Sequence, residues 1–323
     1  MNTELLAADK PADLNRAAAL LQQGALVAVP TETVYGLAAN AADPTAVAKI
    51  FQAKGRPADH PLIVHIPDLA MLEQFAIKIP ATAYQLAAAF WPGPLTLLLH
   101  KAPDVSPVVT GGLETIGIRM PAHPALLALL QQARLAVAAP SANPYKKLSP
   151  TRASQVLHGM AGKVAAVLDG GPCQHGLEST IVDLTGEQIQ ILRSGPISAT
   201  QLEQVLGCRV TTPLQHQVKV SGNVGAHYQP NTAVYLLTPE ALLARLASSN
   251  ARRAVLYYSA LPVTNAAYQQ QLPATAAGYA QQLYHQLFLA DQQGVAEILV
   301  EQPPHSSGWE AVQDRLRRAA HHE

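Results

Sequence analysis

The chain has 323 residues, and its 22 Lys and Arg side chains balance its 22 Asp and Glu side chains, so the formal net charge is zero. Apolar residues make up 49% of the sequence and charged residues only 14%. This composition excludes a disordered chain, which combines low hydrophobicity with high net charge. It also argues against a protein that coats nucleic acid, because such proteins carry a basic excess. The length is about twice that of a typical domain, which favours two domains.

The cysteine count and the N-terminal sequence indicate the cellular compartment in which the protein is expected. Cys173 and Cys208 are the only cysteines and form no C-x-x-C pair, which disfavours a disulfide scaffold and a cysteine-rich zinc site. Residues 1–16 lack the apolar core of a signal peptide, and no run approaches the roughly 20 apolar residues of a membrane helix. The sequence therefore predicts a soluble, cytoplasmic protein.

Helical and strand patterns alternate through the first two-thirds of the chain. Apolar residues at helical spacing predict a helix over 11–23, and an apolar run predicts a strand over 25–29. A helix is expected over 44–53, with Asp43 as its N-cap and Gly55 after its end. The other strands expected here are 62–66, 95–100, 116–119, 136–139, 164–168, 179–183 and 189–192, and the other helices are 67–75, 80–90, 124–133, 199–206 and one that begins near 151.

The pattern breaks at residues 208–231, which lack periodicity and contain several Pro and Gly, as is typical of a linker. The alternation then restarts, with strands over 233–237, 254–257 and 296–300 and helices over 239–247, 276–290 and 309–320. Residues 268–282 are rich in Ala and Gln and are expected to be partly a mobile loop. The sequence thus predicts an α/β fold in two domains, 1–207 and a small Rossmann-like parallel domain over 232–323, joined by the linker 208–231.

Four polar clusters interrupt the apolar chain, at residues 30–36, 54–57, 140–143 and 170–180. Taken singly, each is explained by a helix end, a turn or a cap. Because ligand sites in α/β proteins collect at strand ends and loops, the four together predict a binding site. They supply cations, hydroxyls and amides, with no carboxylate pair, no Ser–His–Asp pattern and no P-loop, which favours an anionic ligand such as a nucleotide triphosphate.

At these clusters the chain resembles the threonylcarbamoyl-AMP synthase family. The matching motifs run in order through residues 29–36, the pairs Lys54/Arg56 and Ser141/Asn143, and residues 91–96, 117–121, 176–181 and 192–195. The C-terminal part resembles the extra domain of the longer members. A motif within the linker, residues 221–230, keeps the family's Gly, His, Tyr and Pro. In it, Ser221 replaces a usual Pro and Gln229 replaces a common Ala.

The resemblance implies an enzyme that condenses L-threonine, bicarbonate and ATP to threonylcarbamoyl-AMP and pyrophosphate. Other proteins, the tRNA-threonylcarbamoyl transfer proteins, then use the product to make N6-threonylcarbamoyladenosine at position 37 of tRNAs that read ANN codons. The implied fold is a twisted, YrdC-like α/β catalytic domain with a concave active-site face. Mg²⁺ is expected to be held mainly by the ATP phosphates, and neither stable nucleic-acid binding nor membrane attachment is expected.

The resemblance also assigns residues to the site. Lys54, Arg56, Ser141 and Asn143 are expected to be catalytic, the two cations by neutralising the phosphates. The ATP-binding residues implied are Lys54, Arg56, His60, Thr115, Ser141, Asn143, Ser149 and Arg193, with His227 and Tyr228 of the linker closing over the triphosphate. The L-threonine-binding residues implied are Thr33, Tyr35, His65, Arg119 and Ser179, with Arg119 as a bidentate clamp for the carboxylate.

Other functions stay open at this point. One is a carbamoyl-adenylate-forming carbamoyltransferase, although relatives of that kind carry an acylphosphatase domain and zinc fingers for which this chain has no room. A second is an RNA-binding module of the same fold, for which Lys146, Lys147 and Arg152 offer a local basic patch within a chain of zero net charge. A catalytically inactive regulatory homologue is a third, and the intact Lys54, Arg56, Ser141 and Asn143 argue against it.

Overall fold

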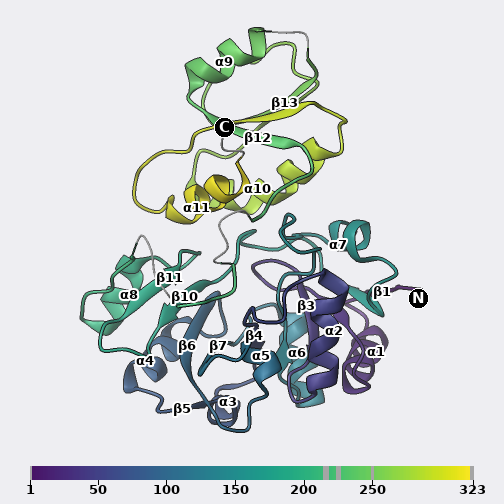
Figure 1. Ribbon diagram of the computed structural model, residues 1–323, viewed down its shortest axis with the longest axis vertical. Helices are drawn as coiled ribbons and strands as arrows, with labels where there is room; N and C mark the ends of the chain where they lie inside the picture. The colour runs from purple at the N-terminus through teal and green to yellow at the C-terminus, as the bar shows by residue number, and fades with distance from the viewer. Residues whose placement is uncertain (1, 214–217, 223–226, 249–250, 321–323) are drawn as a thin grey trace. The chain divides into compact units, whose positions relative to one another are not determined.

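The computed structural model describes residues 2–213, 218–222, 227–248 and 251–320 (Figure 1). Parts of the predicted linker, 214–217 and 223–226, therefore lie outside the described residues. The chain divides into two compact units. The first consists of Met1–Tyr145, Pro150–Gln174 and Glu178–Asn223, and the second of Val224–Glu323 with two short loops, Lys146–Ser149 and His175–Leu177.

The first unit is built on a mixed sheet in the order β1-β9-β2-β3-β8-β4-β7-β6-β10-β11, with β5 paired to β6. Its strands are β1 (Glu4–Ala7), β2 (Val27–Val29), β3 (Gly36–Asn40), β4 (Ile63–His65), β5 (Ala76–Ile77), β6 (Leu95–Lys101), β7 (Thr115–Arg119), β8 (Val137–Ala138), β9 (Ala166–Asp169), β10 (Thr180–Asp183) and β11 (Gln190–Arg193). Its helices are α1 (Pro11–Gln22), α2 (Pro44–Lys54), η1 (Leu69–Met71), α3 (Leu72–Phe75), α4 (Ala81–Phe90), α5 (Pro107–Thr110), α6 (Pro124–Ala133), α7 (Ala153–Met160) and α8 (Ala199–Leu206).

Local sequence signals account for the helix that leads into the site, α2. The Asp43 carboxylate accepts hydrogen bonds from the backbone N–H groups of Thr45 and Ala46, which caps the N-terminus. At the other end Gly55 adopts a φ of 63°, the left-handed conformation that ends many helices at low cost for glycine. Both predicted boundaries are confirmed, and Lys54 is fixed in the last turn, directly before the chain leaves the helix.

Strand register divides the side chains of the sheet between two faces, because directly paired residues point the same way. Val64, Leu97, Ile118 and Val182 lie on the face that packs against the main core, with α2, α4 and α7 among its cover. The opposite face is covered by α1 and α6 at the β2, β3 and β8 end. From β4 to β11 that face carries a small apolar cluster completed by Val220.

Three strands of the first unit that the sequence did not predict, β1, β3 and β5, are short or poor in β-branched residues. β3 reads Gly-Leu-Ala-Ala-Asn, yet it forms antiparallel ladders with β2 and β8. Strand propensity depends on the neighbours that cover a segment, so a buried position between two strands outweighs a weak local preference.

The second unit contains a parallel sheet in the order β12-β15-β13-β14. Its elements are β12 (Ala233–Leu237), α9 (Pro239–Ala247), β13 (Arg253–Tyr257), β14 (Tyr268–Gln271), α10 (Ala276–Asp291), β15 (Glu297–Glu301) and α11 (Glu310–Ala319). This confirms the predicted small parallel α/β domain. The expectation of a mobile loop at 268–282 is wrong, because Tyr268–Gln271 pairs with β13 and the rest lies largely in α10.

Gly195 is expected to tolerate no side chain. A Cβ there would lie 2.6 Å from the backbone carbon of Ser179 and 2.7 Å from the oxygen of Glu178, and also against the backbone N of Thr180. Backbone atoms at the start of a strand cannot move aside cheaply, so Gly195→Ala should lower the free energy of unfolding by about 1–3 kcal/mol. Urea denaturation measures this. Gly186→Ala is the matched control, because its Cβ would meet nothing within 4 Å, and an equal loss in both variants would contradict the prediction.

Candidate functional site

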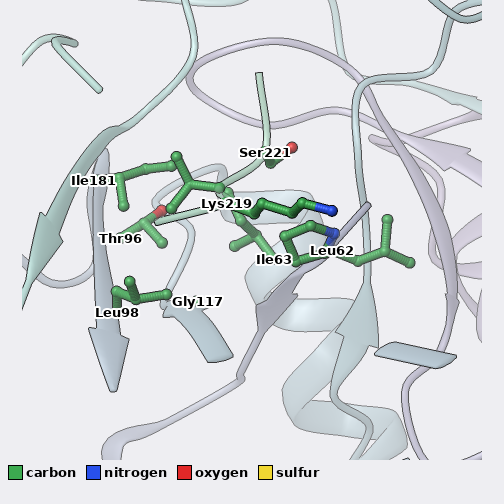
Figure 2. Close-up of a pocket in the computed structure, with 10 residues that line it drawn as sticks. Leu62, Ile63, Thr96, Leu98, Gly117, Ile181, Lys219 and Ser221 are labelled. Carbon is green, nitrogen blue, oxygen red and sulfur yellow. The ribbon is translucent and has the colours of Figure 1, made fainter. Parts of the chain in front are cut away.

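The part of this sheet face from β4 to β11 holds a small, open pocket. Ile63, Thr96, Leu98, Gly117 and Ile181 line it from the strands. Figure 2 shows Lys219 and Ser221 of the predicted linker crossing over these strands. The segment 219–221 is fixed at both ends, since Lys219 Nζ lies 3.3 Å from Asp59 Oδ2 and the Ser221 carbonyl accepts a 2.9 Å hydrogen bond from Arg193 Nη1.

Arg119 lies beside the pocket, two residues along β7 from Gly117 and therefore on the same face. Its side chain is 4% exposed. Nη1 donates a 3.0 Å hydrogen bond to Thr33 Oγ1, and Nη2 lies 2.7 Å from Glu32 Oε1. Two residues 86 and 87 positions earlier in the chain thus hold the guanidinium in place. The sequence predicted Arg119 and Thr33 for the site but not Glu32, although Glu32 stands inside the first polar cluster.

Thr31 shapes the loop that carries Thr33 and Glu32. Its Oγ1 accepts hydrogen bonds from the backbone N–H groups of Thr33 and Val34, donates to the Val34 carbonyl, and lies 2.8 Å from Thr33 Oγ1. Threonine hydroxyls form such turns with their own backbone, which explains why three polar residues interrupt the apolar sequence here. The turn presents the Thr33 hydroxyl to Arg119.

His65 is paired directly with Arg119 in the parallel register of β4 and β7. Burial, and to a smaller extent the positive charge of Arg119, lowers the pKa of His65 from 6.5 to about 3, so the ring is neutral at pH 7. Among the described residues, His65 Nδ1 and Arg119 Nε have no hydrogen-bond partner although both are buried. Buried polar atoms without partners are costly, and a polar ligand on this face would satisfy them.

The depressed pKa of His65 predicts a pH-dependent stability. The unfolded chain takes up this proton below about pH 6.5, whereas the folded protein resists it until the pH approaches about 3. The free energy of unfolding should therefore fall as the pH drops through this window, by at most about 1.4 kcal/mol per pH unit from this group. Urea titrations of the wild type, His65→Gln and the exposed control His158→Gln check this. Only His65→Gln should show a shallower pH slope, and an unchanged slope would contradict the prediction.

Ser179, the residue directly before β10, contacts residues from two groups of the predicted site. Its hydroxyl lies 2.8 Å from Thr96 Oγ1 and accepts a 2.9 Å hydrogen bond from Arg193 Nη2, while Arg193 Nε donates to the Ser179 carbonyl at 3.0 Å. The structure thus brings together Ser179, expected on the threonine side, and Arg193, expected on the nucleotide side. Thr96 is a further residue of this network that the sequence did not single out.

Lys54 gathers the second group of predicted residues. Its Nζ donates hydrogen bonds to the backbone carbonyls of Ser141, at 2.5 Å, and Asn143, at 2.6 Å, across 87 and 89 residues of sequence. Burial, together with the charge of Arg56, lowers the pKa of Lys54 well below its ordinary value. The Arg56 guanidinium is also buried and donates to the Pro61 carbonyl at 3.0 Å. Lys54, Ser141 and Asn143 therefore form one cluster, as the motif spacing predicts.

His60 and Thr115 complete the nucleotide-side predictions in the first unit. The His60 ring meets the Tyr145 ring edge-to-face with centroids 5.6 Å apart, and the Tyr145 backbone N–H donates to the Lys54 carbonyl. Thr115 begins β7 and shares the face of Gly117 and Arg119 by strand alternation. Their contacts with a nucleotide stay predictions.

Tyr35, His227 and Tyr228 make contacts of a structural kind, and Ser149 lies in a loop grouped with the second unit. The Tyr35 hydroxyl donates to the Gly171 carbonyl and accepts from the Gly170 N–H, and burial raises its pKa, so it braces this turn as a neutral phenol. Ser149, His227 and Tyr228 belong to the second unit. There the ring of Tyr228 contacts that of His227, with centroids 4.0 Å apart, and stacks on that of Tyr284, at 5.6 Å. Their predicted ligand roles stay predictions.

Two further features are absent from the described residues. No group of three or more His, Cys, Asp or Glu side chains there is arranged to hold a metal ion. No helix in the described part of the chain is both long and apolar enough to cross a membrane.

Comparison with known proteins now decides the family. A model of the Sua5, YciO and YrdC proteins, described as "Telomere recombination", matches residues 19–195, and the model described as the C-terminal domain of threonylcarbamoyl-AMP synthase matches residues 197–321. The chain belongs to the threonylcarbamoyl-AMP synthase family. The resemblance on which the sequence analysis relied is confirmed, in its two-domain form.

Individual relatives of this family match over nearly the whole chain. The threonylcarbamoyl-AMP synthase of Bacillus subtilis (strain 168) is 41% identical, over 98% of this chain and 95% of that protein. The enzyme of Pyrococcus abyssi is 39% identical, over 94% of this chain and 93% of that protein. The crystal structure of P. abyssi Sua5 complexed with L-threonine matches with a TM-score of 0.91 and 37% identity, over 99% of this chain and 98% of that one.

Proposed function

We propose that this member of the family is an L-threonylcarbamoyladenylate synthase, which condenses L-threonine, bicarbonate and ATP to threonylcarbamoyl-AMP and pyrophosphate. The observation that carries the proposal is a buried, oriented guanidinium, Arg119, beside a neutral histidine, on the one sheet face that also holds Ser179 and Arg193. Near full-length relatives bear the name of this activity, and one of them binds L-threonine in its crystal.

Arg119 is proposed to bind the threonine carboxylate. A guanidinium matches a carboxylate with two parallel hydrogen bonds, and this one still has a buried Nε–H without a partner among the described residues. The neutral His65 ring on the neighbouring strand offers its Nδ1 to the same ligand. Ser179 and Thr33, whose hydroxyls are already oriented by Arg193 and Thr31, complete the polar surroundings. The amino acid is thus held by groups whose positions are fixed before it binds.

The chemistry forms two bonds. The threonine amine attacks the carbon of bicarbonate, water leaves, and the resulting carbamate oxygen attacks the α-phosphorus of ATP with departure of pyrophosphate. His65 is a poor general base because its pKa is lowered to about 3. Holding the three reactants in contact would therefore supply much of the acceleration.

Lys54 and Arg56 are proposed to stabilise the charge that develops on the departing pyrophosphate. An ammonium group has three N–H donors, and Lys54 uses two on the carbonyls of Ser141 and Asn143, which leaves one for a phosphate oxygen. An anion beside Lys54 opposes the effect of burial and restores its positive charge. Bound triphosphate and charged Lys54 therefore stabilise each other.

Mg²⁺ is proposed to enter with ATP. The described residues supply no cluster of carboxylates or histidines for it, so phosphate oxygens and water would provide its ligands. The product is proposed to pass, in the cytoplasm, to proteins that transfer the threonylcarbamoyl group to adenosine 37 of tRNAs reading ANN codons. The predicted division into a catalytic domain, 1–207, a linker, 208–231, and a C-terminal domain, 232–323, is retained as part of the proposal.

Pyrophosphate release, measured while each substrate is omitted in turn, tests the proposal. Release should require L-threonine, bicarbonate and ATP together, and L-serine or L-valine should replace threonine poorly. Release that continues without threonine would refute the assignment.

A further inference from the structure

We propose that Glu32 is a positioning residue for the threonine carboxylate, acting through Arg119. The inference rests on the proposed function and extends it to a residue that touches none of the three substrates in the proposed arrangement. What the structure shows directly is a buried carboxylate whose two oxygens serve two different partners, one of them the guanidinium of the amino-acid site.

The contacts of Glu32 are specific to a carboxylate. Oε1 lies 2.7 Å from Arg119 Nη2, and Oε2 accepts a 3.1 Å hydrogen bond from the backbone N–H of Ala122. The Glu32 side chain is only 3% exposed. An amide in the same place has one oxygen and one NH₂ group, so it would set a donor against either Arg119 or Ala122. Glutamine therefore cannot replace the contacts of Glu32 even though it has the same size and shape.

Because both side chains are buried, the ion pair between Glu32 and Arg119 helps to orient the guanidinium. A buried cation needs a compensating anion, and Glu32 is the only carboxylate that the structure places within ion-pair distance of Arg119 among the described residues. Nη1 donates a hydrogen bond to Thr33 Oγ1 and Nη2 lies within ion-pair distance of Glu32 Oε1, so two contacts hold the outer edge of the guanidinium. The buried Nε–H has no hydrogen-bond partner among the described residues, so it is available to a carboxylate ligand.

Glu32 also connects two loops of the site. It belongs to the turn organised by Thr31, and its bond to Ala122 ties that turn to the segment that follows β7. Arg119, at the end of the strand, and Ala122, three residues further on, thus contact the same side chain. Without Glu32, Arg119 would still be present but would lose its fixed orientation. The loss of binding affinity should therefore be confined to ligands that carry a carboxylate.

The test compares Glu32→Gln and Glu32→Asp with the wild type in steady-state pyrophosphate release. Glu32→Gln should raise the KM for L-threonine about tenfold or more, with the KM for ATP unchanged. Glu32→Asp keeps both oxygens and the charge and should recover part of the loss. Glu73→Gln, which removes an exposed carboxylate bonded to Tyr84, is the matched control. Thermal melting of each variant checks that it is folded.

Binding measured by calorimetry provides the readout that a general loss of structure would not give. L-threonine should bind more weakly to Glu32→Gln, whereas L-threoninol, which has no carboxylate, should bind the variant and the wild type equally. Equal weakening of both ligands, a KM for threonine within twofold of the wild type, or a failure of aspartate to recover any binding would each overturn the inference. If Glu32→Gln does not fold, the same comparison is made with Glu32→Asp. If the wild type released pyrophosphate at the same rate with and without threonine, the proposed function would be refuted, and the inference with it.

Discussion

Lys54→Met is expected to reduce pyrophosphate release at least a hundredfold while the protein stays folded. Two of the three N–H groups of Lys54 Nζ donate to the carbonyls of Ser141 and Asn143, and the third is available to a phosphate. Removing a donor that acts on charge developing in a buried site costs about 10²–10³ in rate. Methionine keeps an unbranched side chain as far as Cε but carries neither the charge nor the donor.

A lysine on the same helix provides the control for this prediction. Lys49 Nζ donates a 2.6 Å hydrogen bond to the Gly24 carbonyl, so Lys49→Met also removes a lysine-to-carbonyl bond from α2. Lys49→Met should leave turnover close to that of the wild type. Each variant loses structural bonds worth about 0.5–3 kcal/mol, which urea denaturation measures separately. Turnover of Lys54→Met within a few-fold of the wild type would contradict a phosphate-binding role.

Arg119→Lys is expected to raise the KM for L-threonine between tenfold and a hundredfold, with little change in the KM for ATP. Lysine keeps a positive charge beside Glu32, which preserves the buried pair. It cannot, however, contact Thr33, Glu32 and a carboxylate in the planar geometry that arginine offers. The loss of one charge-assisted hydrogen bond is worth about 1.5–3 kcal/mol.

The control for Arg119→Lys is Arg16→Lys, at an exposed arginine whose guanidinium is paired with Glu4. That exposed pair lies outside the residue groups described for the site and should leave both KM values unchanged. If Arg119→Lys raised the KM for L-threonine and the KM for ATP equally, or left both unchanged, the threonine carboxylate would have to bind elsewhere.

The fold was predictable wherever local chemistry determines it. Asp43 and Gly55 set the ends of α2 through a carboxylate cap and a left-handed backbone, and both signals act within a few residues. The alternation after residue 232 likewise produced a parallel sheet, because each strand there is followed by a helix or a short connection. β3 and β14 were missed since their strand character comes from neighbours distant in sequence.

The candidate site was predictable as a set of residues but not as a geometry. The motifs selected Lys54, Ser141 and Asn143, and the structure places them in contact. The hydrogen bonds from Lys54 are accepted by the backbone carbonyls of the other two residues and not by their side chains. Glu32 could not be assigned from sequence, because a carboxylate inside a turn motif has an ordinary explanation as a surface group. Only the 2.7 Å contact of its Oε1 with Arg119 Nη2, and the burial of both side chains, reveal its partner.

Labelled bicarbonate gives the most direct test of the central claim, that one sheet face joins threonine to the α-phosphate of ATP through a carbon from bicarbonate. The wild type, supplied with ¹³C-bicarbonate, L-threonine and ATP, should form an adenylate that carries the label and the threonyl group, as seen by mass spectrometry of the rapidly quenched reaction. Arg119→Lys should form it only at raised threonine. An adenylate that contains threonine without the labelled carbon, or the label without threonine, would contradict the account.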